Sequence, residues 1–369
     1  MTAETTDPTV PAVATAGTGL SVSSGLSVGV FLLAGHFPAV SQAQTLRLAV
    51  DYARAAEQAG FAGVWLAEHH FIRYGVCPSA VAFAAHLLGA TRTIEVGTAA
   101  AILPNRHPVA LAEEATLLDA VSGGRFRLGV ARGGPWVDLE VFGTGLARYE
   151  KGFAESLDLL LRALREPSVD ATGEFFQFRP VPLVPRPQRP VPVWVAATSA
   201  ATVDLAAERG LPLLLGMHED ETAKAAMIAR HGAPGLPHVS AHLTYVSDSR
   251  AQAEAALRAS LPGWLSLTRE YTRLDGTRPD RDLGAYLEHL LRISPIGTPE
   301  ECVYQLNQVI AATGARRLLL MVEAAGEPRL TRTNIQRLGA EVLPHLTATT
   351  PLINASTAIS AVPCPHRWG

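Results

Sequence analysis

The 369-residue sequence is poor in lysine and has no cluster of basic residues. Lys and Arg together number 31 and Asp and Glu number 34, yet Lys151 and Lys224 are the only lysines. The formal net charge is −3. A protein that binds nucleic acid needs a basic patch or stripe as its electrostatic footprint. We therefore expect no nucleic-acid partner.

Cysteine is also scarce. Cys77, Cys302 and Cys364 lie far apart in the sequence and show no paired spacing. This excludes a disulfide framework and a cysteine-based metal site, and it is typical of a reduced, cytoplasmic compartment.

Long hydrophobic runs are missing as well. The segment 8–46 has no Asp, Glu, Lys or Arg, but its continuous apolar part, near VGVFLLAG, is only about ten residues long against the roughly 20 that span a bilayer. A signal peptide needs a basic segment before its apolar core, whereas the first basic residue here is Arg47. We expect no membrane partner.

Both ends of the chain are rich in Ser, Thr, Ala and Pro. Such segments cannot bury enough apolar surface to offset the entropy of ordering. The sequence therefore predicts a flexible N-terminal leader over 1–25, one domain over 26–346 and a flexible C-terminal tail over 347–369.

Within this domain, short runs rich in Val, Ile and Leu alternate with longer segments of helical spacing. The expected strands are 26–33, 63–68, 94–103, 125–131, 191–197, 211–216, 239–246 and 316–323. The expected helices are 44–59, 78–90, 107–120, 147–165, 200–209, 219–230, 249–270, 299–312 and 329–343. Eight alternating strands predict an α/β fold, a (β/α)8 TIM barrel with insertions. A doubly wound sheet is the alternative, although AGHFPAVSQ after the first strand lacks the GxGxxG of dinucleotide-binding folds.

Two connections are long. The proline-rich stretch 171–192 cannot be helical and predicts an insertion over 166–190, as extended loops or an edge hairpin. The second, around YTRLDGTRPDRD, is polar, and we expect a mobile region at about 262–290.

Three ionisable residues, Glu68, His69 and His70, follow the second expected strand in the stretch GVWLAEHHFIRYG. Catalytic groups of TIM barrels lie at such strand ends. Adjacent histidines on a strand end point in different directions and no HExxH or cysteine partner accompanies them, so a metal site is not expected. The remaining alternatives are an active site or one buried and one surface histidine.

Two further strand ends could bind an anion. Arg132 stands between glycines in GVARGG, and Thr198, Ser199 and Thr202 begin a helix in AATSAAT. A guanidinium and a helix N-terminus are both anion ligands, although each feature alone is also common as a plain turn or cap. Together they would converge on one dianion at the mouth of the barrel.

The sequence resembles the bacterial luciferase-like flavin monooxygenases. Four stretches carry the resemblance in the order of that family's core: WLAEHHFIRYG, HLLGATRTIEVGTAAAILPNRHPV, LLDAVSGGRFRLGVARG and AAERGLP. The resemblance runs from about residue 28 to 216, and more weakly to about 345. It implies a TIM barrel that binds reduced FMN at its mouth and uses O2.

The resemblance also implies roles for individual residues. Glu68 and His69 match the catalytic pair beside the flavin ring, with His69 as the acid or base. The matching flavin-binding residues are Glu68, the cis-linked pair Ala99 and Ala100, and the phosphate ligands Arg132, Thr198, Ser199 and Thr202. Candidate substrate contacts are His36, Phe37, Trp136 and Met217. Light-emitting members have Cys just before the phosphate-binding Arg, and Ala131 stands there instead, which argues against bioluminescence.

By this resemblance the protein is a two-component enzyme. A separate NAD(P)H:flavin reductase supplies FMNH2, and a flavin C4a-hydroperoxide transfers one oxygen atom to an organic substrate by hydroxylation, epoxidation or Baeyer–Villiger insertion. We favour tailoring of a natural product such as a polyketide. A homodimer is expected to pack through 82–90 and 107–121. Two alternatives stay open: an F420-dependent oxidoreductase without O2 chemistry, and a non-catalytic flavin-binding partner subunit.

Overall fold

The structure is a computed structural model that describes residues 25–38 and 40–347. Nearly all of the expected leader and tail therefore lies outside the described residues. The described chain is built around a closed parallel barrel, in which β1 pairs with both β2 and β13 and the circle is completed by the pairing of β3 with β5. The eight barrel strands, in chain order, are β1 (Ser27–Leu32), β2 (Gly63–Leu66), β3 (Glu95–Thr98), β5 (Phe126–Ala131), β8 (Val193–Ala197), β9 (Leu213–Leu215), β10 (Val239–Leu243) and β13 (Arg317–Met321).

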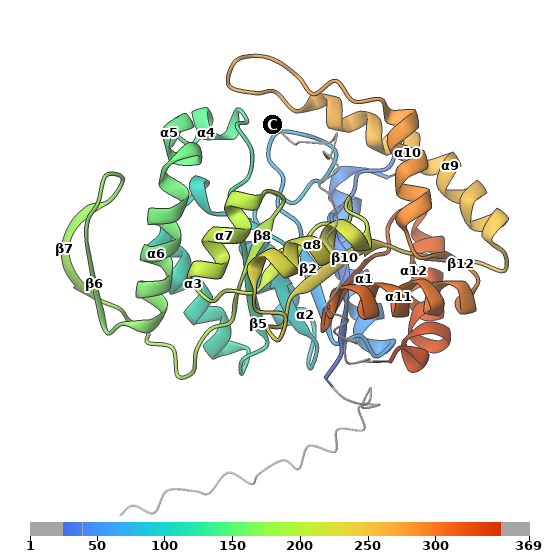
Figure 1. Cartoon of the computed structure of the whole chain (residues 1–369), viewed down its shortest axis with the longest axis horizontal. Helices are drawn as coiled ribbons and strands as arrows, with labels where there is room; N and C mark the ends of the chain where they lie inside the picture. The colour runs from blue at the N-terminus through green and yellow to red at the C-terminus, as the bar shows by residue number, and fades with distance from the viewer. Residues whose placement is uncertain (1–24, 39, 348–369) are drawn as a thin grey trace, which may run out of the picture.

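Each strand falls within one of the eight expected strand segments, and the TIM-barrel prediction is confirmed. Helices surround the strands (Figure 1). They are α1 (Gln42–Gln58), α2 (Ala80–Ala90), α3 (Pro108–Val121), α6 (Gly152–Arg165), α7 (Ala200–Glu208), α8 (Glu221–His231), α9 (Arg250–Ser266), α10 (Leu283–Ile293), α11 (Pro299–Thr313) and α12 (Pro328–Arg337). The shorter helices α4 (Asp138–Val141) and α5 (Gly145–Glu150) follow β5.

Local signals explain where several helices begin. Ser41 and Gln44 form a capping box before α1, and Thr298 and Glu301 form another before α11, whose first residue is Pro299. These contacts satisfy backbone N–H groups that a helix leaves without partners in its first turn. The helix α11 begins at residue 299, as the expected helix 299–312 does.

The third expected strand is interrupted. The peptide bond between Ala99 and Ala100 is cis, and the chain continues as β4 (Ala101–Ile102), which pairs with β5. The resemblance implied this cis bond. It places Ala100 at the rim of the barrel, among the residues that line a cavity described below.

Other segments add detail to the expectations. The insertion contains an antiparallel hairpin of β6 (Ser168–Thr172) and β7 (Gln177–Pro182), which projects from the barrel in Figure 1. The segment expected as 239–246 is split into β10 and β11 (Tyr245–Val246), and β11 pairs with β12 (Ile296–Gly297). The region 262–290 holds the end of α9, a short 3-10 turn and most of α10, a helix that the sequence analysis did not predict.

Two kinds of feature are absent from the described part of the chain. Among residues 25–38 and 40–347, no helix is long and apolar enough to cross a membrane. The same residues contain no group of three or more His, Cys, Asp or Glu side chains that could hold a metal ion.

Candidate active site

Glu68 lies directly after β2 and is buried at the barrel mouth. Its Oε2 accepts hydrogen bonds from Ala80 N (2.9 Å) and Arg106 Nη2 (2.7 Å), and its Oε1 accepts one from Ile102 N (3.1 Å). Burial alone would raise the pKa of Glu68, but hydrogen bonds to the carboxylate from His70, Arg106 and Ala80, with the charge of Arg106, bring the pKa below its ordinary value. Glu68 is therefore an ionised carboxylate held by four segments of the chain.

His70 supports this carboxylate. Its Nε2 lies 3.5 Å from Glu68 Oε1, and its ring packs edge-on against Phe142 with 5.0 Å between ring centroids. Its neighbour Phe71 has a positive φ of 59° and is 57% exposed. The structure thus places His70 between the carboxylate and the rim, rather than in a separate site.

His69 has a different environment from His70. Its backbone N–H donates to Cys77 O (2.9 Å), and its ring meets the ring of Tyr74 edge-on at 5.3 Å. The buried Nδ1 has no hydrogen-bond partner among the described residues. Burial, which outweighs the opposing charge of Glu68, lowers the pKa of His69 to about 4. The imidazole is therefore neutral near pH 7, so it can accept a proton but carries none to donate as an imidazolium.

A cavity of about 180 Å³ lies against these residues. Small residues on one side leave room for a flat ligand, and two aromatic rings, Trp136 and Tyr271, stack on each other with centroids 4.6 Å apart. Backbone hydrogen bonds from Val137 N to Thr272 O and from Leu274 N to Pro135 O join the two segments that carry these rings. The lining residues are Glu68, His69, His70, Ala100, Ile102, Ala131, Gly133, Trp136, Asp138 and Tyr271.

The expected anion ligands leave two neighbouring strands. β5 pairs with β8, so Arg132 and the start of α7 lie at adjacent strand ends. Ser199 is the N-cap of α7: Thr202 N donates to its Oγ (3.3 Å), and the two hydroxyl oxygens are 3.0 Å apart. The guanidinium of Arg132 lies 4.6 Å from the centre of the Tyr149 ring. Thr198, one residue earlier, is exposed.

Comparison with known proteins decides the family. Residues 26–317 match the family model described as luciferase-like monooxygenase. The chain belongs to the luciferase-like monooxygenase family. The resemblance seen in the sequence is confirmed, and with it the expectation of a flavin-dependent monooxygenase.

Curated relatives of this luciferase-like monooxygenase align over nearly their whole length. The alkanal monooxygenase alpha chain of the Kryptophanaron alfredi symbiont is 30% identical over 351 residues, which cover 87% of this chain and 98% of that protein. The 4-hydroxyprotoasukamycin monooxygenase of Streptomyces nodosus subsp. asukaensis is 28% identical over 355 residues, covering 90% and 95%.

Solved structures share the fold. The monooxygenase RslO1 from Streptomyces bottropensis superposes with a TM-score of 0.76 at 22% identity, covering 87% of this chain and 99% of that one. The oxygenating constituent of 3,6-diketocamphane monooxygenase from Pseudomonas putida, solved in complex with FMN, gives 0.69 at 17% identity with the same coverage. An F420-dependent secondary alcohol dehydrogenase gives 0.69 at 15% identity, again with coverage of 87% and 99%.

Of the candidate substrate contacts in this luciferase-like monooxygenase, only Trp136 lines the cavity beside His69. Met217 is buried after β9, and His36 Nε2 bonds to Val40 O (2.9 Å). Phe37 stacks on Trp264 with 5.6 Å between centroids and lines a separate cavity. The structure therefore does not bring His36, Phe37 and Met217 to the cavity wall.

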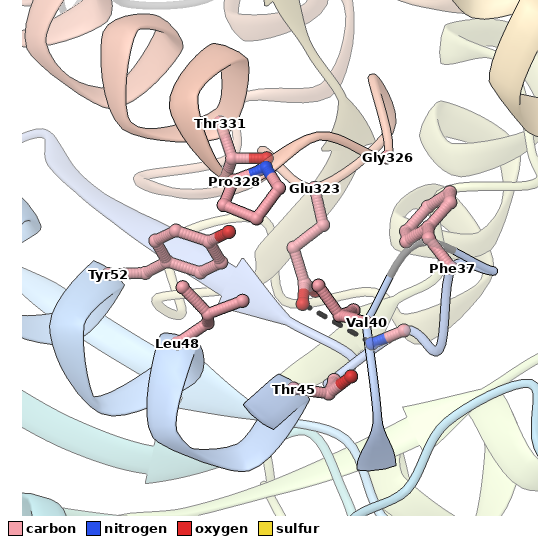
Figure 2. A pocket seen from close by; sticks show the side chains of 10 residues that line it. Phe37, Val40, Thr45, Leu48, Tyr52, Glu323, Gly326, Pro328 and Thr331 are labelled. Atoms are coloured by element: carbon pink, nitrogen blue, oxygen red, sulfur yellow. Dashed lines mark hydrogen bonds between the residues drawn. The ribbon is translucent and has the colours of Figure 1, made fainter. Parts of the chain in front are cut away.

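Figure 2 shows this separate cavity, with Glu323 beside Tyr52 and Phe37. Glu323 accepts hydrogen bonds from Leu33 N (2.7 Å) and Gly35 N (3.3 Å). Burial raises the pKa of Glu323 to about 7 despite these donors. The carboxyl group thus ties the loop after β1 to the end of β13.

Several site residues escaped the sequence analysis. Arg106, which contacts Glu68, lies in the stretch AILPNRHPV but was not singled out there. Asp138 and Tyr271 line the cavity from segments that no motif marks, and Tyr271 comes from the connection between α9 and α10. Only Arg106 had a usable signal, because a basic residue just after the third strand could have been tested as a partner for the predicted carboxylate.

Gly75 determines where the His69 ring can lie. A Cβ at this position would overlap His69 Nδ1 and would lie 2.7 Å from Leu33 O. We expect Gly75→Ala to displace the imidazole and to lower kcat at least tenfold, with a stability loss of about 1–3 kcal/mol from overpacking. Steady-state kinetics and thermal unfolding would check this. Gly89→Ala is the control, since a Cβ there meets nothing within 4 Å; equal kinetics for both variants would contradict the expectation.

Proposed function

We propose that the protein is an FMNH2-dependent, two-component monooxygenase that inserts one oxygen atom of O2 into an organic substrate. One observation carries the proposal: a neutral, buried imidazole with an unpartnered Nδ1 stands beside an ionised carboxylate on a cavity at the barrel mouth. Proton transfer to or from a bound ligand requires a base in its neutral form, and a carboxylate beside that base can orient it.

The described residues fit FMN. Ala100, Ala131 and Gly133 leave a flat wall for the isoalloxazine ring, and Glu68 and His69 border the same cavity. Arg132 and the N-terminus of α7, with Thr198, Ser199 and Thr202, would hold the phosphate, because guanidinium and helix N–H groups both bind dianions. Reduced FMN supplies the electrons with which O2 is activated.

The chain's own residues would control protons and water. His69 is placed to accept a proton from a ligand in the cavity, because its pKa of about 4 leaves it unprotonated near neutrality. Glu68 keeps its charge through Arg106 and gives His69 a nearby negative charge that stabilises the protonated form. The stacked rings of Trp136 and Tyr271 form a wall that excludes water from the cavity.

Several partners follow from this proposal. The chain lacks a GxGxxG sequence after its first strand, so a separate NAD(P)H:flavin reductase would supply FMNH2. A relative named for a monooxygenase of 4-hydroxyprotoasukamycin supports a natural product as the organic substrate. A cytoplasmic location agrees with two unpaired, buried cysteines, Cys77 and Cys302.

A homodimer is part of the proposal. The outer side of α3 leaves Leu117 51% and Val121 70% exposed, and α2 exposes Ala82 and Ala85 beside it. Apolar and small residues on adjacent helices permit close packing against a second copy. Sedimentation at micromolar concentration would test this, and a monomer at all concentrations would contradict it.

The decisive experiment supplies the protein with photoreduced FMN and 18O2, together with an extract from a strain lacking the gene. We expect one compound to gain a single oxygen atom, which adds about 16 Da under ordinary O2 and about 18 Da under 18O2. Reduced F420 replaces FMN in a parallel reaction, because an F420-dependent dehydrogenase shares the fold. A product formed with F420 and without oxygen incorporation would overturn the monooxygenase proposal.

The phosphate assignment can be tested by flavin titration. Ser199→Ala removes both the cap of α7 and a hydroxyl at its N-terminus. We expect at least tenfold weaker FMN binding, with about 1 kcal/mol lower stability from the lost cap. Riboflavin, which has no phosphate, should bind both proteins equally. A matched control is Ser249→Ala, which removes the same N-cap bond from α9; weaker FMN binding there would contradict the assignment.

A further inference from the structure

Lys224 is a fully buried lysine in the first turn of α8. Lysine is almost never fully buried unless it is paired with an acid, yet Lys224 forms no ion pair in the described part of the chain. The only other lysine, Lys151, is exposed. Arginine occupies nearly all basic positions of this chain, and one of its two lysines is fully buried.

The side chain of Lys224 joins α8 to β10. Its Nζ donates to Ala241 O (2.7 Å) and lies 3.4 Å and 3.5 Å from the two ring nitrogens of His242. His242 Nε2 is in turn 2.8 Å from Ser240 Oγ. Side chains alternate along a strand, and Ala241 packs inside the barrel, so Ser240 and His242 point outward. We call Lys224, Ser240 and His242 the Lys224 cluster.

Acidic side chains act on the Lys224 ammonium of the cluster. On the loop and helix that carry Lys224, the acids Glu219, Asp220 and Glu221 favour its ammonium form, while burial opposes that form more strongly. The balance lowers the pKa of Lys224 to about 7. On the strand side, burial and the nearby amine keep the pKa of His242 well below its ordinary value. Near pH 7, Lys224 is thus the group of the cluster that binds a proton.

The Lys224 cluster adjoins the loop after β9, which lies at the end of the barrel where the strands finish and the candidate site is found. This loop, 216–220, runs from β9 to α8, and its last residue, Asp220, caps the helix through a hydrogen bond from Ala223 N (2.9 Å). Lys224 lies in the first turn after that cap, so a displacement of this turn would be passed to the loop.

His218 lies in the middle of this loop and joins it to α10. Its imidazole bonds to the Tyr286 hydroxyl, and its carbonyl accepts from His289 Nε2 (2.8 Å). Burial, followed by the charges of Arg281 and Lys224, lowers the pKa of His218 to about 3. Lys224 and His69 both lie within electrostatic reach of the His218 imidazole.

A buried amine without a counter-ion lowers the stability of the fold, whereas methionine would fill similar space without that cost. Residues that cost stability are retained where function needs them. We propose that Lys224 is a positioning residue for the oxygenation reaction: it fastens the first turn of α8 to the end of β10 and so holds His218 at the barrel mouth. This inference rests on the proposed function for its role in catalysis, but the positioning itself can be measured without turnover.

The first measurement is hydrogen exchange on the full-length apoprotein, with Lys224→Met against Lys151→Met. At pH 7 we expect the amides of 216–220 to exchange at least tenfold faster in Lys224→Met, although its thermal midpoint is higher than that of the wild type. A substitution that only weakened the fold would not speed amide exchange in one loop while it raised the thermal midpoint. Unchanged exchange in this loop would overturn the proposal, whatever the enzyme's activity.

The stability readout has a defined pH dependence. Between the folded pKa of about 7 and the unfolded value of 10.5, the unfolded chain binds a proton that the folded protein does not, so wild-type stability rises with pH in this window. The difference in the free energy of unfolding between Lys224→Met and the wild type should therefore become smaller from pH 7 to pH 10. A difference that does not change with pH would contradict the titration of Lys224 in this window.

The kinetic readout uses decanal as the probe substrate with photoreduced FMN. We expect Lys224→Met to raise the KM for decanal at least tenfold, with kcat within threefold and FMN affinity within twofold of the wild type. An unchanged KM would overturn the catalytic role. If Lys224→Met does not fold, His242→Leu removes the partner from the strand side and should produce the same loosening of 216–220. Wild-type protein that oxygenates nothing would refute the proposed function but not the exchange result.

Discussion

His69→Ala is expected to lower turnover by about 10²–10⁴-fold, the usual contribution of a positioned acid or base. The imidazole is buried, its Nδ1 has no partner among the described residues, and it borders the cavity beside Glu68. Oxygen transfer from photoreduced FMN to decanal, measured under saturating O2, would give kcat and KM. We expect FMN affinity to change less than threefold, because the proposed phosphate ligands follow other strands, β5 and β8.

The pH dependence gives a second test of the same residue. With a pKa of about 4, His69 stays neutral at any ordinary pH, so kcat/KM should show no His69-dependent fall between pH 8 and pH 5. Unlike kcat/KM, the stability of the fold should depend on pH in this range. The imidazole has a pKa of 6.5 in the unfolded chain and about 4 in the folded protein, so between these values only the unfolded chain binds the proton. The fold therefore loses stability as pH falls from about 6.5 to about 4. This loss should be absent from His69→Ala.

Two controls separate chemistry from packing. His70→Ala removes a neighbouring imidazole that contacts Glu68 at 3.5 Å, and we expect a much smaller loss of turnover. Imidazole added to His69→Gly should restore part of the activity, because the vacated space accepts the missing ring. If His69→Ala retained full kcat with decanal, the assignment of His69 as the base would be wrong.

The barrel was predictable because its signals are periodic and local. Runs such as GVWLAE and RFRLGVA are continuous apolar segments, as expected of strands buried on both faces, and they alternate with helices that have clear caps. The position of Glu68 and His69 on a cavity at the barrel mouth was predictable for the same reason, since residues at the strand ends of a TIM barrel lie at its mouth. Helix α10 was missed because the polar stretch before it obscures an N-cap at Asp282.

What the sequence could not supply depends on contacts between distant segments. Tyr271 lines the cavity because a backbone bridge joins Arg273 to Trp136 and the two rings stack, and no local pattern encodes that pairing. The resemblance implied that His69 acts as an acid or a base and did not decide between the two. Burial lowers the pKa of His69 to about 4, which favours the base role. A pKa is set by surroundings and not by residue type.

Arg106→Gln is expected to have the largest effect on stability among substitutions around the site. Arg106 Nη2 lies 2.7 Å from Glu68 Oε2, and the side chain of Glu68 is 0% exposed. Removing one partner of a buried ion pair leaves an uncompensated charge and costs about 3–5 kcal/mol in fully buried pairs. The Arg106 side chain is 19% exposed, so we expect the lower part of that range, about 3 kcal/mol. Arg329→Gln is the control, because its side chain is 82% exposed.

The sign of the pH dependence distinguishes this account from a simple loss of packing. In the wild type the depressed pKa of Glu68 contributes stability above its unfolded value of 4.5, and this contribution is lost as pH falls through the folded pKa. Without Arg106, burial would have the largest effect on the pKa of Glu68 and would raise it. The folded protein would then favour the protonated carboxyl group. Urea unfolding at several pH values should therefore show the deficit of Arg106→Gln largest at pH 6–8 and smaller near pH 4.

The same substitution tests whether the charge of Glu68 matters for catalysis. The carboxyl group would still be held in place by Ala80 N, Ile102 N and His70. A neutral Glu68 would therefore keep its position and lose its negative charge. His69 would then lose the neighbouring negative charge that favours its protonated form, and it would become a weaker base. We expect kcat for decanal to fall about tenfold at pH 7 while FMN affinity stays within threefold. Unchanged kcat with the expected loss of stability would show that Arg106 and the charge of Glu68 serve the fold alone.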